Sequence, residues 1–164
     1  MGMIPARFEY RQAGSVVEAL QLLASCDDAK LLAGGHSLVP LMKMRLVSPS
    51  TLIDISGIAE LQGITDAGSV LRVGALTRHR VVERSQVVVQ QVPLLAHVAG
   101  LVGDPQVRNR GTIGGSLVHG DPAADLPSVA LASGATMVVT GSAGERRVAA
   151  GDFFVRSEEH TSEL

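Results

Sequence analysis

The sequence predicts an α+β fold of two subdomains, and three observations support this prediction. In the first part of the chain, helical patterns alternate with short aliphatic runs that stop at glycine. In the second part, turn residues separate short apolar runs in the manner of β-hairpins. Apolar residues make up 46% of the 164 residues, which is enough to form cores. We expect a small βαβ-type N-terminal subdomain over residues 1–57, and over residues 58–155 a second one with a mixed or antiparallel sheet and helices.

The first helix is predicted over residues 15–26, where Val, Ala and Leu recur at helical spacing. Ser15 and Glu18 stand three residues apart, as in a capping box that begins a helix. The elements that follow are a buried strand, a helix with Pro40 in its first turn, and a second strand. They cover residues 30–33, 37–46 and 51–55.

Turn signals organise the second subdomain. The segment Asp66-Ala67-Gly68-Ser69 is typical of a hairpin turn, and residues 141–145 separate two further runs with strand character. Thr77 is expected to cap a helix, whereas the polar residues 103–111 are expected to form a loop. The predicted strands cover residues 61–65, 70–74, 135–140 and 147–149, and the predicted helices cover residues 77–84, 92–102 and 122–133.

Charge and composition exclude several classes of function. Fourteen basic and sixteen acidic residues give a net charge of −2, whereas a protein that binds nucleic acid normally carries a basic excess. The single cysteine, Cys26, excludes an internal disulfide framework and any zinc or iron–sulfur site held only by cysteines of this chain. The sequence has no pattern typical of a signal peptide and no apolar run of about 18 residues, so we expect a cytoplasmic protein without a transmembrane segment.

The last nine residues differ in character from the rest of the chain. Residues 156–164, RSEEHTSEL, break abruptly with the aliphatic sequence before them and match the translation of a widely used sequencing adapter. We therefore expect a foreign tail, and a natural protein that continues beyond Val155. Without this tail, thirteen basic residues balance thirteen acidic ones. A genuine polar terminus is the alternative.

Two glycine pairs are candidates for a ligand site. Gly34-Gly35 follows a predicted strand, and Gly114-Gly115 follows Thr112 at a distance of one residue. Turns of this kind expose backbone N–H groups with no side chain in the way, which suits a phosphate or pyrophosphate. Ser37 and Ser116 could add hydroxyl donors. Tight turns or close packing are the alternative explanation for paired glycines.

A serine hydrolase is a weaker hypothesis. Residues 35–39 imitate the nucleophile elbow G-x-S-x-G with Ser37 as the nucleophile. Val39, however, replaces the second glycine of that motif, and the sequence singles out no acid or second histidine to complete a catalytic triad.

A metal site is also a weak hypothesis. His119, Asp121 and Asp125 could bind a divalent metal, but a turn in which Asp121 caps the helix entered at Pro122 explains them better, so no metal ligand is assigned. Other charged or imidazole side chains on predicted helices are expected to be ordinary packing or solvated residues. These are Arg78, His79, Arg80, Arg84 and His97.

Two longer segments are more specific than either glycine pair. KLLAGGHSLVPLMKMRL covers residues 30–46, and GDPQVRNRGTIGGSLVHGDPAADLP covers residues 103–127. Together they resemble the FAD-binding medium subunit of the molybdenum hydroxylases, the family of aerobic carbon monoxide dehydrogenase and xanthine dehydrogenase. The resemblance spans residues 4–155. It implies a two-subdomain FAD-binding module of the PCMH type, and a smaller C-terminal domain that this C-terminally truncated chain lacks.

The resemblance also implies FAD as the cofactor and names residues that hold it. Residues 33–37 would bind the pyrophosphate, residues 112–116 would form a second FAD loop, and Asp125 would bind ribityl or ribose hydroxyls. Ser116 stands where asparagine is common in the family, which leaves its side-chain hydrogen bond open. The implied contacts are Leu32, Ala33, Gly34, Gly35, His36, Ser37, Leu38, Leu61, Thr112, Gly114, Gly115, Ser116, His119, Ala124 and Asp125.

A division of labour between subunits is implied as well. In a heterotrimer or its dimer, a molybdopterin-binding large subunit and a [2Fe–2S] small subunit would pass electrons to FAD on this subunit, and NAD, a quinone or oxygen would receive them. No catalytic acid or base is assigned to the chain. A scaffold or assembly module of the same fold without flavin is the alternative, and by itself the chain is expected to bind FAD weakly at most.

Overall fold

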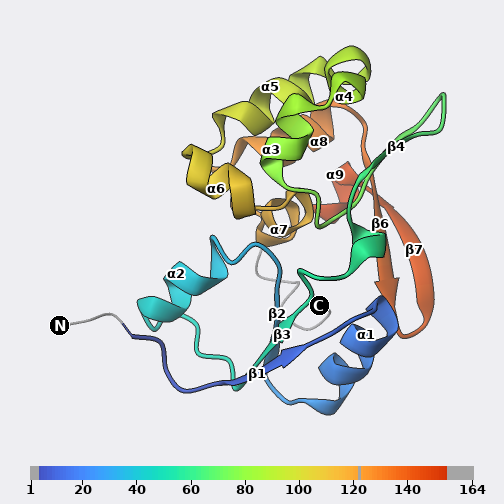
Figure 1. Ribbon diagram of the computed structural model, residues 1–164. Helices are drawn as coiled ribbons and strands as arrows, with labels where there is room; N and C mark the ends of the chain where they lie inside the picture. Colours follow the sequence, from blue (N-terminus) through green and yellow to red (C-terminus); the bar gives the residue numbers. More distant parts are fainter. Residues whose placement is uncertain (1–3, 122, 155–164) are drawn as a thin grey trace.

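The computed structural model describes residues 4–121 and 123–154, and its first sheet has three parallel strands (Figure 1). β3 (Thr51–Asp54) lies between β1 (Glu9–Gln12) and β2 (Ala29–Leu32). The central strand β3 is buried over its first three residues. β2 is not the buried strand that we predicted, because it lies at the sheet edge and Leu31 is 41% exposed. The strand β1 is not among our predictions.

Helix α1 (Val16–Ser25) joins β1 to β2 and begins at the predicted cap. The Ser15 hydroxyl accepts a hydrogen bond from the N–H of Glu18 at 3.2 Å. The Glu18 carboxylate accepts from the N–H of Gly14 at 2.8 Å, one residue before the partner of a standard capping box. Helix α2 (Leu38–Lys43) follows β2 and carries Pro40 in its first turn, as predicted.

Two antiparallel hairpins confirm the turn predictions of the second part. β4 (Ile64–Asp66) pairs with β5 (Leu71–Val73) after the short 3-10 helix η1 (Ala59–Leu61), and β6 (Thr136–Gly141) pairs with β7 (Gly144–Ala149) before α9 (Ala150–Phe153). The Asp66 carboxylate accepts from the N–H of Gly68 at 2.8 Å, which stabilises the first turn.

Most of the remaining helices gather at the opposite end of the molecule from the first sheet, and α7 lies between them and that sheet (Figure 1). Val82, Val88, Ala96 and Ala99 form a buried cluster among them. These helices are α3 (His79–Arg84), α4 (Gln86–Gln91), α5 (Pro93–Leu101), α6 (Pro105–Arg110), α7 (Ile113–His119) and α8 (Asp125–Ala132).

The predicted loop over residues 103–111 is wrong, because most of it forms helix α6. The Asp104 carboxylate accepts from the N–H groups of Gln106 and Val107 at 2.8 and 2.9 Å. Pro105 occupies the first helical position, where its missing N–H costs nothing. A strong cap therefore outweighs the polar composition that favoured a loop.

Two predicted helix caps are also wrong. Thr77 precedes the cap position of α3, and its hydroxyl instead donates to the carbonyl of Gly63 and accepts from the N–H of the same residue, both at 2.9 Å. Helix α8 begins at Asp125 with Ala124 at its cap position, and the Asp121 carboxylate accepts from the N–H of Ala123 in a preceding turn. Pro122, which we expected at the start of that helix, lies outside the described residues.

The first hydrophobic core crosses the expected subdomain boundary. Ile58 and Leu76, from beyond that boundary, are buried together with Ala13, Ala19 and Ile53. The two expected subdomains therefore share apolar contacts, and their division stays a prediction. The expected foreign tail over residues 156–164 lies outside the described residues. Among residues 4–121 and 123–154, no helix is long and apolar enough to cross a membrane.

Candidate functional site

The first glycine pair lies in the connection between β2 and α2, as predicted. Gly35 has a φ of +75°, a left-handed conformation that favours glycine. Within the described part of the chain, the backbone N–H groups of Gly34, Gly35 and His36 donate no hydrogen bond. These three donors are therefore available to an anionic ligand.

The second glycine pair does not lie in a loop, so that prediction is wrong. Gly114 and Gly115 form part of the first turn of α7, because the Thr112 hydroxyl accepts from the N–H of Gly115 at 3.2 Å and caps the helix. The N–H of Gly114 donates to the carbonyl of Ala75, and that of Ser116 donates to the carbonyl of Thr112. These backbone N–H groups already have partners. Unlike those of the first glycine pair, they are therefore not free to donate to a ligand.

The two glycine segments pack against each other. A Cβ atom at Gly34 would overlap the carbonyl oxygen of Arg110 and lie 2.9 Å from the Cα of Gly111. A Cβ atom at Gly115 would lie 4.0 Å from that of Ala33. Close backbone packing therefore requires the glycine at position 34, which is the alternative explanation that the sequence left open.

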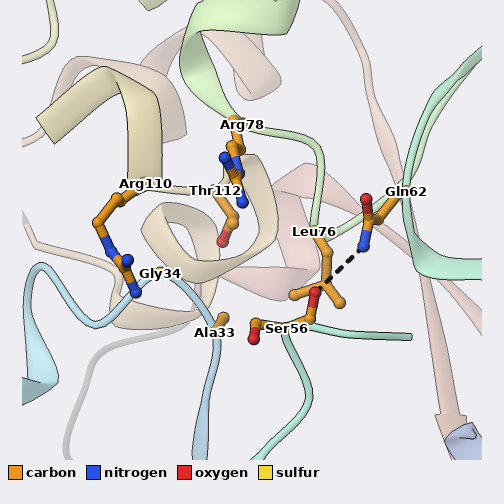
Figure 2. Close-up of a pocket in the computed structure, with 8 residues that line it drawn as sticks. All are labelled: Ala33, Gly34, Ser56, Gln62, Leu76, Arg78, Arg110 and Thr112. Atoms are coloured by element: carbon orange, nitrogen blue, oxygen red, sulfur yellow. Dashed lines mark hydrogen bonds between the residues drawn. The ribbon is translucent and has the colours of Figure 1, made fainter. Parts of the chain in front are cut away.

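A cleft of about 160 Å³ opens beside this contact (Figure 2). At one end, the Gln62 side-chain amide donates to the backbone carbonyl of Ser56 at 3.1 Å. The cleft is smaller than the ~300–1,000 Å³ of pockets that enclose a whole small molecule, so its size suits one portion of a larger ligand. Its lining residues are Ala33, Gly34, Ser56, Gln62, Leu76, Arg78, Arg110 and Thr112.

Two arginines give the cleft a positive charge. Figure 2 shows the Arg78 side chain beside Thr112 and the Arg110 guanidinium reaching toward Gly34. Within the described residues, neither arginine forms an ion pair with a carboxylate. The two guanidinium groups can therefore attract an anion into the cleft.

The carboxylate of Asp54, at the end of β3, has a pKa that the charge of Arg110 helps to lower. Partial burial raises the pKa of Asp54, but hydrogen bonds from Tyr10 and Ser56 and the charge of Arg110 outweigh burial and hold that pKa below its usual value. The Tyr10 hydroxyl donates to Asp54 Oδ2 at 2.5 Å, and the backbone N–H of Ser56 donates to Oδ1 at 2.8 Å. Asp54 is therefore ionised near neutral pH but occupied by its own partners.

Three of the implied FAD contacts line the cleft, namely Ala33, Gly34 and Thr112. Sequence reasoning did not identify Arg78 and Arg110 as residues of this site. Arg78 is not on the face of α3 but at its cap position, which directs it toward the cleft. Arg110 ends a helix that we predicted as a loop. The available signal for Arg110 was its position two residues before Thr112. Arg78 reaches Thr112 through an antiparallel bridge between distant segments, which no local pattern indicates.

The other implied contacts lie outside the wall of the cleft. Leu38 begins α2, His119 is the exposed last residue of α7, and Asp125 is the first residue of α8. A role for these residues in binding FAD stays a prediction. The implied contacts that do not line the cleft are Leu32, Gly35, His36, Ser37, Leu38, Leu61, Gly114, Gly115, Ser116, His119, Ala124 and Asp125.

His79 makes a contact that sequence reasoning missed. We expected an ordinary surface or packing residue, and the buried residue, only 1% exposed, confirms packing; its Nε2 also lies 3.1 Å from the Ser116 hydroxyl oxygen. Burial, together with the charge of nearby His36, lowers the pKa of His79 to about 4. The contact identifies the partner of the Ser116 side chain, which the sequence left open. His97, by contrast, is exposed on α5.

Neither weaker hypothesis gains support from the geometry. Among the described residues, the Ser37 hydroxyl has no hydrogen bond to a histidine, and the serine–histidine contact involves Ser116 instead. In the same part of the chain, no group of three or more His, Cys, Asp or Glu side chains could hold a metal ion.

Comparison with known proteins shows the same family over nearly the whole chain. A family model for the FAD binding domain in molybdopterin dehydrogenase matches residues 6–163. The carbon monoxide dehydrogenase medium chain of Hydrogenophaga pseudoflava is 51% identical over 154 residues, which cover 93% of this chain and 54% of that protein. The glyceraldehyde dehydrogenase medium chain of Sulfolobus acidocaldarius is 41% identical, with 93% and 54% covered.

Solved structures agree with these relatives. Carbon monoxide dehydrogenase from Hydrogenophaga pseudoflava, in a form that lacks the Mo-pyranopterin moiety of the molybdenum cofactor, matches with a TM-score of 0.91 and 51% identity over 93% of this chain and 53% of that chain. Quinoline 2-oxidoreductase from Pseudomonas putida 86 matches with a TM-score of 0.87 and 42% identity over 90% and 52%. The chain spans about half the length of the relatives it matches. It belongs to the family of FAD-binding domains of molybdopterin dehydrogenases.

Proposed function

We propose that this chain is the FAD-binding part of an electron-transfer subunit in a molybdenum hydroxylase of the carbon monoxide dehydrogenase type. The observation that supports this proposal most directly is the cationic cleft beside the first glycine pair. An FAD diphosphate carries negative charge and many acceptor oxygens. Guanidinium groups and unpaired backbone N–H groups complement both properties.

The residues divide into donors, cations and packing residues. The N–H groups of Gly34, Gly35 and His36 would donate to the diphosphate, and Arg78 and Arg110 would balance its charge. The glycine at position 34 would let its segment approach the backbone of Arg110 and Gly111 closely enough for the two segments to share one ligand.

The remaining contacts follow from family membership. Leu32 and Leu38 would line the approach to the diphosphate, and Leu61 would pack on the adenine side. His119 and Ala124 would lie against the cofactor, and the Asp125 carboxylate would accept hydrogen bonds from its ribityl or ribose hydroxyls. The other contacts in this proposal are Ala33, Ser37, Thr112, Gly114, Gly115 and Ser116.

Bound FAD would supply the redox chemistry, and the chain would hold and orient it. The single cysteine of this chain agrees with [2Fe–2S] clusters on a partner small subunit. The substrate would react on a molybdopterin-binding large subunit, and NAD, a quinone or oxygen would accept the electrons.

Titration of the purified chain with FAD, ADP and riboflavin tests the binding site. We expect weak but saturable binding of FAD and ADP and none of riboflavin, which has no phosphate. Arg110→Gln should weaken FAD and ADP binding about tenfold, or about 1.4 kcal/mol, because it removes a charged donor. The control Arg146→Gln, an exposed arginine on β7, should leave both affinities unchanged.

Flavin fluorescence for FAD and riboflavin, and calorimetry for ADP, measure these affinities. Saturable FAD binding whose affinity Arg110→Gln leaves unchanged would contradict the proposed site, because the charge of Arg110 would then not hold the diphosphate. Riboflavin binding as tight as that of FAD would show that the diphosphate is not what the cleft recognises.

A further inference from the structure

The buried contact between His79 and Ser116 carries an inference about how the site presents a hydroxyl donor. His79 begins α3, and its Nε2 lies 3.1 Å from Ser116 Oγ in the first turn of α7. The backbone N–H of His79 donates to the carbonyl of Gly111 at 3.0 Å. A Cβ atom on Gly111 would lie 2.9 Å from the imidazole Cδ2, so the absence of a side chain there makes room for the ring.

The imidazole is neutral near pH 7 and carries one proton. Burial, and to a smaller extent the charge of His36, lowers the pKa of His79 to about 4. The proton can therefore lie on Nδ1 or on Nε2, and the surroundings of the two atoms decide which tautomer forms.

The surroundings favour the proton on Nε2. The His79 Nδ1 atom is buried and has no hydrogen-bond partner among residues 4–121 and 123–154. A proton there would leave a buried N–H donor unpaired, and such donors are rarer in folded proteins than unpaired acceptors. A proton on Nε2 is directed at the Ser116 oxygen instead.

This tautomer determines the role of the serine hydroxyl. A hydroxyl has one proton to donate and lone pairs to accept with, so an oxygen that accepts from His79 keeps its own proton for another partner. Ser116 is only partly buried, and the described residues offer its hydroxyl no other hydrogen bond.

We propose that His79 is a positioning residue: its Nε2–H donates to Ser116 Oγ and so turns the Ser116 hydroxyl proton toward an anionic oxygen of the ligand. The ligand side of this inference rests on the proposed function, in which α7 lies beside the FAD diphosphate. The assignment of the His79 proton to Nε2 rests on contacts within the protein alone.

Nuclear magnetic resonance of the ¹⁵N-histidine-labelled full chain without ligand tests the tautomer. At pH 7 we expect a proton on Nε2 of His79, with a ¹⁵N shift that changes in Ser116→Ala. A proton on Nδ1 would overturn the inference. This measurement needs no flavin, so it remains decisive even if the chain fails to bind FAD and the proposed function fails.

Fluorescence titration with FAD tests the consequence. The amide nitrogen of Gln reaches about as far as imidazole Nε2, whereas that of Asn reaches only as far as Nδ1. We expect His79→Asn to weaken FAD binding about tenfold, while His79→Gln stays within about twofold of the original protein. The control His97→Gln, on the exposed side of α5, should have no effect.

A double variant separates positioning from a purely structural role. In the Ser116→Ala background, His79→Asn should have no further effect on FAD affinity, because the hydroxyl that it positions is absent. An equal loss in both backgrounds would overturn the inference, and so would equal losses in His79→Asn and His79→Gln.

Discussion

Acidification is expected to destabilise the fold through His79. The folded protein keeps this side chain neutral down to a pKa of about 4, whereas the unfolded chain binds a proton below about 6.5. The unfolded state therefore takes up a proton first as the pH falls. The stability is fully present above pH 6.5 and is lost as the pH falls from 6.5 toward 4.

The magnitude follows from the gap between the two pKa values. One pH unit of that gap corresponds to about 1.4 kcal/mol, so the full gap corresponds to about 3 kcal/mol. Between pH 7.5 and pH 5.0, the loss from His79 alone is about 2 kcal/mol in the free energy of unfolding. Such a loss is a large part of the stability of an ordinary domain.

Urea unfolding followed by circular dichroism at several pH values measures this loss. The comparison protein is His79→Gln, which keeps the amide donor toward Ser116 but has no group that titrates at this position. Asp54 and Asp66, whose pKa values are also lowered in the folded protein, occur in both proteins and cancel in the difference. We expect the original protein to lose about 2 kcal/mol more than the variant.

His97→Gln removes an exposed histidine and should keep the pH dependence of the original protein. If His79→Gln loses as much stability as the original protein between pH 7.5 and 5.0, the buried neutral imidazole is not the source of the acid sensitivity, and the reasoning fails.

Three further changes test the packing and capping that build the site, each measured as the urea midpoint. Gly34→Ala should destabilise by about 1–3 kcal/mol, since its Cβ would overlap the Arg110 carbonyl, whereas Gly141→Ala meets no atom within 4 Å and should be nearly neutral. Asp104→Ala should cost about 1 kcal/mol by uncapping α6, and Asp104→Asn should retain most of that stability. Thr112→Val should cost about 1 kcal/mol by uncapping α7, with Thr112→Ser close to the original; equal effects of Val and Ser would refute that cap.

Short-range chemistry explains which elements the sequence predicted well. The Ser15 cap of α1 and the turn at Asp66 depend on residues two or three positions apart, so their signals are complete within a few letters. The same chemistry was present at Asp104 and Thr112, where polar composition and paired glycines outweighed it in the prediction of loops. These errors concern the interpretation of local signals rather than missing information.

By itself, the sequence determined the α+β class, the two hairpins, the family and the position of the first glycine pair. Only the tertiary structure decided that Gly34 packs on the backbone of Arg110, that Arg78 and Arg110 enter one cleft, and that His79 meets Ser116. The reason is physical. Each of these contacts joins segments that lie far apart in the chain, so burial, charge and protonation at the site depend on packing that no local pattern contains.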